Sequence, residues 1–234
     1  IETDEEIIAK LVADFADRKL YIADGHHRYE TALNYRNYCR ENGISKPGDP
    51  QDFQMIYLVD MEHPGLVVFP THRLVRDLPN FDKEAVLEKC SEFFYIDEKE
   101  GTDTMEEDLK KLYDEGKKAF GFYCGKGEWF LLTLKNIDIM SQMLPNVSKA
   151  SQSLDVSVLH TLILEKIFGI DKENMAKQIN LTYTKFFTEA IDGVDKGEFQ
   201  CSFVLNPTRV TEIRDVAAAG EKMPQKSTYF YPKM

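Results

Sequence analysis

Cysteine is scarce in this sequence, and its spacing excludes the usual disulfide and zinc frameworks. Four cysteines lie far apart and form no Cys-x-x-Cys pair: Cys39, Cys90, Cys124 and Cys201. The N-terminus carries no signal-peptide pattern either. We therefore expect free thiols in a cytoplasmic protein.

Positive charge and long apolar runs are also lacking. Lys and Arg together number 29 against 40 Asp and Glu, which gives a formal net charge of −11. A chain this acidic is a poor candidate for nucleic-acid binding, although one local basic pocket is compatible with it. No apolar run is long enough to span a membrane, so with 43% hydrophobic residues we expect a soluble globular protein without a membrane partner.

Several well-known catalytic signatures are absent. The sequence has no His-Glu-x-x-His pair, no Gly-x-Ser-x-Gly elbow and no Gly-x-Gly-x-x-Gly fingerprint. The adjacent His26 and His27 would point about 100° apart on a helix, so they do not by themselves form a metal site. We predict no metal ligands in the protein.

One short stretch, residues 19–33, combines features that favour binding of an anion. Leu20–Ala23 is apolar and short enough for a buried strand, and the apolar residues that follow recur with helical spacing. Between them, Asp24 suits the helix N-cap and Gly25 lets a ligand come close to the backbone. The stretch therefore predicts a strand, a tight turn and a helix.

Three donors follow on the first turn of that helix: His26, His27 and Arg28. Unpaired amides and the positive end of the helix dipole favour a phosphate at such a place. The alternative is a surface helix, capped by Asp24, whose polar first turn faces water.

Three separate motifs resemble those of one bacterial and archaeal family, called domain of unknown function 1015. They are Tyr21–Ala32 (YIADGHHRYETA), Leu154–His160 (LDVSVLH) and Ala219–Lys233 (AGEKMPQKSTYFYPK). The motifs occur in the expected order, and the resemblance covers essentially the whole chain. Family members carry a further region before this point, so we expect the chain to be the C-terminal part of a longer protein whose site it does not complete.

The helix start also bears a distant resemblance to the ParB and sulfiredoxin-like fold, which includes free-serine kinases. The resemblance rests on Asp24, Gly25, His27 and Arg28. Members of that group place nucleotide phosphates at this turn, which implies ATP or ADP as the ligand here. If ATP is the donor, a magnesium ion is expected, and Asp24 or Glu30 would reach it.

A second basic stretch follows a predicted strand. Pro70–Arg76 places His72 and Arg73 directly after the strand predicted at Leu66–Phe69, where α/β proteins collect polar site groups. An ordinary exposed basic loop is equally compatible with this pattern.

The tail at Gly220–Ser227 imitates a P-loop, but Gln225 stands where the second glycine belongs. Lys226, Ser227 and Thr228 nevertheless put a cation and two hydroxyls on a predicted exposed loop. If this tail folds back over the helix start, Lys226 would neutralise a phosphate. The alternative is a solvated lysine.

We expect a mixed α+β fold in three segments. Residues 1–78 hold the strand-turn-helix unit, residues 79–145 a small α+β subdomain, and residues 146–234 an α/β segment that packs back on the first. In the third segment, His160 is expected to be a buried, hydrogen-bonded side chain.

Local signals predict several element boundaries. Thr3 and Glu6 fit a capping box for a first helix. Phe53–Val59 and Leu66–Phe69 are predicted to form a hairpin. Asn206 is predicted to cap the helix that follows it.

The first functional hypothesis is an enzyme that binds a small phosphorylated molecule, such as a nucleotide, and transfers or hydrolyses a phosphoryl group. By analogy with free-serine kinases, the acceptor is a small hydroxylated metabolite. The catalytic candidates are Asp24, His27 and Glu30. The phosphate-binding candidates are Gly25, His26, Arg28, Arg73, Lys226, Ser227 and Thr228.

A second hypothesis is a ParB-like nucleotide-sensing or regulatory module that binds without turnover. The acidic balance weighs against DNA as its partner. A third is a chain that folds but has lost part of its site. Steady turnover of a small substrate separates the first hypothesis from the others; the sequence leaves the oligomeric state open.

Overall fold

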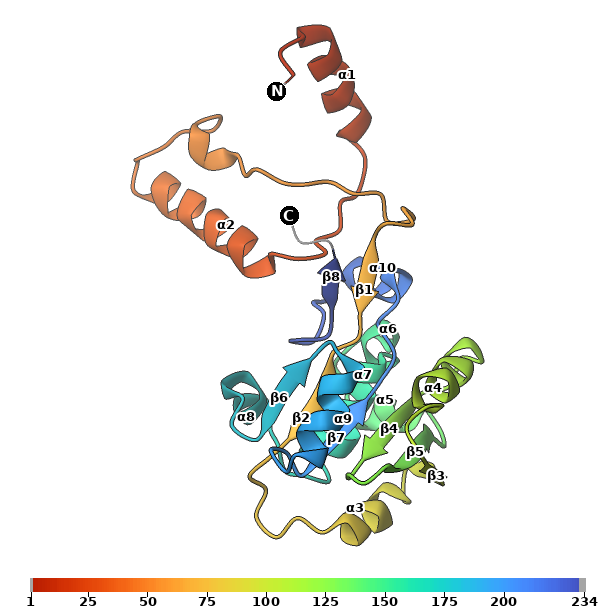
Figure 1. Cartoon of the computed structure of the whole chain (residues 1–234). Helices are drawn as coiled ribbons and strands as arrows, with labels where there is room; N and C mark the ends of the chain where they lie inside the picture. The colour runs from red at the N-terminus through yellow and green to blue at the C-terminus, as the bar shows by residue number, and fades with distance from the viewer. Residues whose placement is uncertain (1, 232–234) are drawn as a thin grey trace. The chain divides into compact units, whose positions relative to one another are not determined.

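The structure, a computed structural model, describes residues 2–231 (Figure 1). The chain divides into two compact units, Ile1–Leu58 and Val59–Met234, here called unit 1 and unit 2 and described separately. Helices and antiparallel sheets make up the protein, so the predicted mixed α+β class is confirmed.

Unit 1 consists of helices α1 (Glu5–Phe15) and α2 (His26–Glu41) and a short 3-10 turn, η1 (Pro50–Asp52). The N-cap of α1 is Asp4, whose carboxylate accepts from the amides of Glu6 and Ile7. The capping box predicted with Thr3 is therefore wrong. Asp4 takes that place because its carboxylate reaches the free amides of the first turn.

Unit 1 buries few side chains. Of its described residues, only Cys39 and Ser45 are buried. The segments Leu20–Ala23 and Phe53–Val59 form no strand, and Met55 in the second of them is 93% exposed. Both strand predictions are wrong. The apolar and β-branched residues favour a strand only where a neighbouring strand supplies hydrogen bonds and side-chain contacts.

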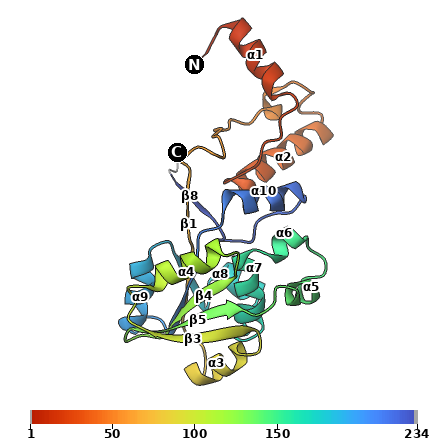
Figure 2. The ribbon, with the colours of Figure 1, turned by 90° about the vertical axis from the view of Figure 1, so that its right-hand side faces the viewer.

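Unit 2 is built on a six-stranded antiparallel sheet with the order β3-β5-β4-β7-β2-β6. Its strands are β2 (His72–Val75), β3 (Phe94–Glu100), β4 (Ala119–Tyr123), β5 (Glu128–Leu134), β6 (Leu181–Thr184) and β7 (Cys201–Val204). Figure 2 shows β3, β5 and β4 side by side. The turn predicted at Gly125–Gly127 joins β4 to β5, as expected.

Helices cover both faces of this sheet. On one face, Val75, Phe122 and Phe203 belong to the larger hydrophobic core, and the rings of Phe122 and Phe203 stack at 4.9 Å. The helices on that face are α3 (Lys83–Cys90), α5 (Ile139–Met143), α7 (Asp155–Val158), the π-helical η2 (Leu159–Glu165) and α8 (Lys172–Lys177). On the other face, Trp129 and Val204 pack with α4 (Met105–Asp114) and α9 (Phe187–Asp195).

Strand β2 lies between β6 and β7 and contributes to both faces. Successive strand residues point to opposite sides of a sheet. Arg73 therefore shares the face of Val75 and the larger core, whereas His72 shares the face of Leu74, which lies against Gly193 of α9.

A second, two-stranded sheet pairs β1 (Val67–Phe69) with β8 (Tyr229–Tyr231). The strand predicted at Leu66–Phe69 is thus present, but the hairpin with Phe53–Val59 is wrong. The partner comes from the far end of the chain, and no local signal specifies such a pairing.

The remaining helices are α6 (Lys149–Gln152) and α10 (Val210–Ala218). The amide of Arg209 at the start of α10 donates to the Glu212 carboxylate over 2.9 Å. Asn206, predicted to cap this helix, instead donates from its side-chain amide to the carbonyl of Leu109 over 3.0 Å. The cap prediction is wrong because the chain stays extended for three more residues before the helix begins.

The four cysteines are free, as predicted, and Cys39, Cys90 and Cys201 are buried. Among the described residues, no helix is both long and apolar enough to cross a membrane.

His72 is a buried histidine in the central strand. Its Nδ1 accepts from the amide of Leu205 over 3.4 Å, and its Nε2 has no partner in the described part of the chain. Burial, and secondly the charge of Arg73, lowers the pKa of His72 from 6.5 to about 4. The unfolded chain takes up this proton at a higher pH than the folded chain does. Folding stability therefore falls as the pH drops from 6.5 towards 4.

We predict that His72→Gln reduces this loss of stability on acidification. The wild-type loss at this residue is at most about 3 kcal/mol between about pH 7 and about pH 4.5. Urea denaturation at the two pH values measures it, with the exposed His63→Gln as the control. The carboxyl of Asp155, whose pKa burial raises to about 6, acts in the opposite direction in every variant and cancels in the comparison. Equal acid sensitivity of the two variants would contradict this assignment.

Candidate functional site

The first turn of α2 leaves backbone donors unused. Its N-cap is Gly25, in the left-handed conformation at φ +86°, and no side chain accepts from the first-turn amides. That turn contains no acidic residue. The amides of His26, His27 and Arg28 therefore lack an acceptor among residues 2–231, and they lie at the positive end of a 16-residue helix.

Asp24 does not cap α2. Its Oδ1 accepts from the amide of Gly25 over 2.8 Å, one residue before the helix. The prediction of Asp24 as N-cap is wrong, because the left-handed Gly25 occupies the N-cap position and the carboxylate accepts from the amide before the helix. The helix start is consequently open to an anion.

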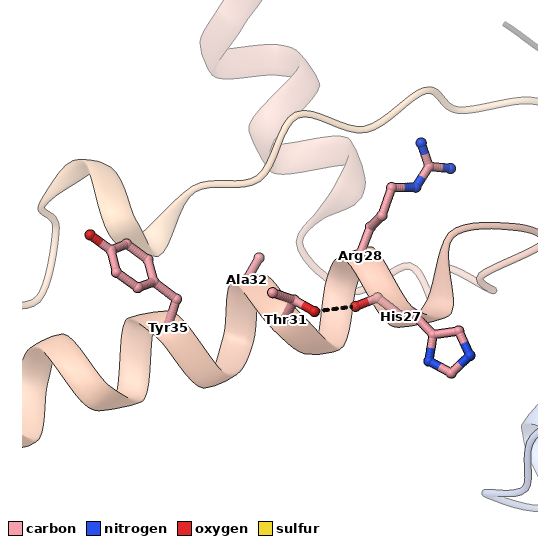
Figure 3. Close-up of a pocket in the computed structure, with 5 residues that line it drawn as sticks. All are labelled: His27, Arg28, Thr31, Ala32 and Tyr35. Atoms are coloured by element: carbon pink, nitrogen blue, oxygen red, sulfur yellow. Dashed lines mark hydrogen bonds between the residues drawn. The ribbon is translucent and has the colours of Figure 1, made fainter.

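Arg28 turns back towards Gly25. A methyl group on Gly25 would lie only 2.9 Å from Nη2 of Arg28, so the guanidinium rests against the glycine. Figure 3 shows Arg28 and His27 leaving the start of α2 in different directions. Together with Thr31, Ala32 and Tyr35 they line an open hollow of about 450 Å³ (Figure 3).

A histidine and a carboxylate lie close together on the same turn. Nδ1 of His27 is 3.7 Å from Oε2 of Glu30, and the His27 side chain is 96% exposed. The carbonyl of His27 accepts from Oγ1 of Thr31 over 2.8 Å, the dashed line in Figure 3. An exposed imidazole next to a carboxylate has the composition of a general acid–base pair.

Arg73, predicted to be a site residue in a loop after a strand, with an ordinary exposed basic loop as the alternative, is instead a fully buried strand residue of unit 2. It pairs with Tyr183 of β6 on one side and Phe203 of β7 on the other. The loop placement shared by both interpretations is wrong, because Arg is almost never fully buried unless paired and the local sequence does not show a two-sided strand partner.

Three neutral acceptors hold the Arg73 guanidinium. Nη1 donates to the carbonyl of Thr71. Nη2 donates to Nε2 of His160 over 3.1 Å and to the carbonyl of Lys226 over 3.2 Å. The ring of Tyr183 lies 5.5 Å from the guanidinium carbon.

The tail residues reach Arg73 through their backbone. The Lys226 side chain is exposed, Ser227 is buried and Thr228 is half-buried. Lys226 has a left-handed backbone at φ +55°, and the carbonyl of Ser227 accepts from Oγ1 of Thr208 over 3.2 Å. The structure thus brings Arg73 and the backbone at Lys226 together in unit 2. That these residues bind phosphate stays a prediction.

His160 is hydrogen-bonded, as predicted, but the residue is half-buried and not fully buried, and the sequence did not indicate Arg73 as its partner. Burial, with the charge of Arg73 adding to it, holds the pKa of His160 well below its usual value, so the ring is neutral and accepts from Arg73. The sequence signal was its position at the end of the Leu154–His160 motif.

Unit 2 also contains a cluster of opposite charges that the sequence analysis did not predict. Nζ of Lys118 lies 3.0 Å from Oδ1 of Asp155 and 3.4 Å from Oε1 of Glu212. Tyr113 donates to Glu212 over 2.9 Å. Tyr113, Asp155 and Glu212 come from α4, α7 and α10, and Lys118 lies just before β4; only Asp155 lies in a motif. Within the described part of the chain, no group of three or more His, Cys, Asp or Glu side chains is arranged to hold a metal ion.

The family described as "Protein of unknown function (DUF1015)" matches residues 2–157. The chain belongs to this family. The match to DUF1015 includes the α2 start and Arg73 and ends before His160 and Lys226. No curated protein matches the chain.

Solved structures resemble this DUF1015 chain at low identity. A conserved hypothetical protein from Pyrococcus furiosus is 19% identical over 89% of this chain and 68% of its own, with a TM-score of 0.45. Free serine kinase in complex with AMP is 14% identical over 98% of this chain and 81% of its own, with a TM-score of 0.47. A mutant of free serine kinase in complex with ADP is also 14% identical with the same coverage, with a TM-score of 0.45. At these values the resemblance assigns no ligand or residue role to this chain.

We predict that Gly25→Ala lowers the free energy of anion binding at the start of α2 by more than it lowers the free energy of unfolding. The left-handed backbone costs an alanine about 1 kcal/mol, and the new methyl group also displaces Arg28. Gly43→Ala is the matched control, because Gly43 has φ +68° but nothing within 4 Å of an added methyl group. Thermal melts and phosphate titrations of both variants measure the two effects. Equal phosphate affinity in both variants would show that Arg28 does not act at this glycine.

Proposed function

We propose that this DUF1015 chain binds the phosphate groups of a nucleotide at the start of α2 and transfers a phosphoryl group to a small hydroxylated metabolite or to water. The observation that carries the proposal is the first turn of α2, where three amides that lack an acceptor among residues 2–231 lie beside an arginine folded over Gly25. An open helix start of this kind attracts anions through both its amides and its dipole.

The charge of Arg28 adds to the backbone donors. Guanidinium binds phosphate oxygens through two parallel N–H groups, and charge-assisted bonds of this kind are stronger than neutral ones. Phosphoryl transfer depends mainly on positioning and on stabilising the charge of the transferred group. We assign both tasks to Arg28 and the amides of residues 26–28.

We assign proton transfer to the pair of His27 and Glu30. In the proposed reaction the acceptor hydroxyl forms a bond to phosphorus, the bond to the bridging oxygen of the nucleotide breaks, and the hydroxyl proton passes to His27. Glu30, 3.7 Å from the imidazole, stabilises the resulting imidazolium. A magnesium ion brought by the nucleotide would neutralise phosphate charge, and Asp24 and Glu30 offer the oxygen ligands that it prefers.

Serine is the first acceptor to assay. The reason is the resemblance of Asp24, Gly25, His27 and Arg28 to the helix start of free-serine kinases. A nucleotide-sensing module is the alternative, and it differs in one observable property: it binds nucleotide without turnover.

We predict that Arg28→Ala weakens ATP or ADP binding roughly 10- to 100-fold, because it removes a charge-assisted contact of about 1.5–3 kcal/mol. Thermal stability should change little, since the Arg28 side chain is exposed. Calorimetric titration of the chain with ATP, ADP and AMP, with and without magnesium, measures the affinity. Arg36→Ala, two turns further along α2, is the matched control.

A coupled assay with ATP and serine, or with ATP alone, then separates the functions. Turnover lost in Arg28→Ala and His27→Ala, but kept in Arg36→Ala, supports the enzyme. Binding without turnover supports the sensing module. Nucleotide affinity that is equal in Arg28→Ala and the wild type would overturn the site itself.

A further inference from the structure

Arg73 carries a buried charge that no carboxylate balances. It is 0% exposed, and no Asp or Glu among residues 2–231 lies within ion-pair distance of its guanidinium. All three of its acceptors are neutral: two carbonyls and one imidazole nitrogen. A buried charge normally has an opposite charge beside it, because burial removes the stabilisation that water provides.

Two buried donors are unused, one in the guanidinium itself and one in the residue that follows Lys226. Nε of Arg73 has no hydrogen-bond partner among the described residues, and neither does Oγ of Ser227. Ser227 directly follows Lys226, whose carbonyl occupies Nη2 of Arg73. Nε and Nη2 form one edge of the guanidinium, the edge with which arginine binds an oxyanion through two parallel bonds.

Segments far apart in the sequence meet at this edge. Arg73 comes from β2, His160 from the π-helical η2, and Lys226 and Ser227 from the tail before β8. π-Helical turns are rare in proteins overall, but those that occur are often at functional sites. Lys226, the tail residue at this contact, has a left-handed backbone conformation. Few non-glycine residues adopt this conformation.

We propose that unit 2 binds a small oxyanion, a phosphate or carboxylate group, at the Nε–Nη2 edge of Arg73. The anion replaces the Lys226 carbonyl at Nη2, accepts from Nε, and accepts from Oγ of Ser227. The carbonyl of Thr71 and the imidazole of His160 keep the guanidinium in place. The anion supplies the negative charge that residues 2–231 do not place beside Arg73. This site is independent of the α2 start, and it stands if the proposed function fails.

Nitrogen-15 NMR tests the proposal directly through the Nε–H signal of Arg73, identified by its loss in Arg73→Met. The protein is the whole chain carrying Arg28→Ala, so that binding at the α2 start does not contribute. Sodium phosphate and sodium acetate are titrated separately, with sodium chloride at matched ionic strength as the control. We expect the Arg73 signal to move and saturate with phosphate or acetate, and the effective anion identifies the ligand group as a phosphate or a carboxylate. A signal that moves with neither, or equally with chloride, overturns the proposal.

Two variants check the geometry by thermal shift, because an anion that binds only the folded state raises the melting temperature. Ser227→Ala should weaken binding of the effective anion roughly 10- to 100-fold, the loss of one hydrogen bond to a charged acceptor. Arg76→Met removes a nearby exposed arginine and should leave the shift unchanged. An unchanged affinity in Ser227→Ala overturns the assigned geometry, and this variant keeps the test valid if Arg73→Met does not fold.

Discussion

The pairing of β2 with both β6 and β7 is the constraint on which unit 2 depends. The strand has only four residues, and two of them are basic, yet hydrogen bonds on both sides fix it in the interior of the sheet. Its side chains point alternately to the two faces of the sheet: Val75 packs in the larger core, and Leu74 lies against α9. Both His72 and Arg73 are therefore buried, because every position of this strand faces a layer of helices.

Burial of these two basic groups has different consequences. Histidine responds by losing its proton, since its pKa falls to about 4. Burial also lowers the pKa of Arg73, but only to about 10, so the guanidinium stays charged at neutral pH. Unit 2 therefore contains a permanent interior charge. Asp155, another buried charge of this unit, has Lys118 at 3.0 Å, whereas the described residues offer Arg73 only neutral acceptors.

Unit 1 follows a different principle, because it buries almost nothing among its described residues. The chemistry of its helix start comes from local conformation. A left-handed Gly25 takes the N-cap position and the Asp24 carboxylate binds the amide before the helix, so the first-turn amides have no acceptor in the described part of the chain. The two units thus present positive charge in two ways, through exposed backbone donors in one and through an interior side chain in the other.

The sequence by itself determined the features that depend on neighbouring residues. The helix after Gly25 and the hairpin around Gly125–Gly127 follow from local patterns, because turns and helical spacing are set within a few residues. The free cysteines follow from their wide spacing in the sequence. Tertiary structure alone decided that Leu20–Ala23 forms no strand, that β1 pairs with β8, and that Arg73 lies buried beside His160 and the tail. Each of these depends on which distant segment supplies the partner, and a strand or a buried charge is stable only when that partner is in place.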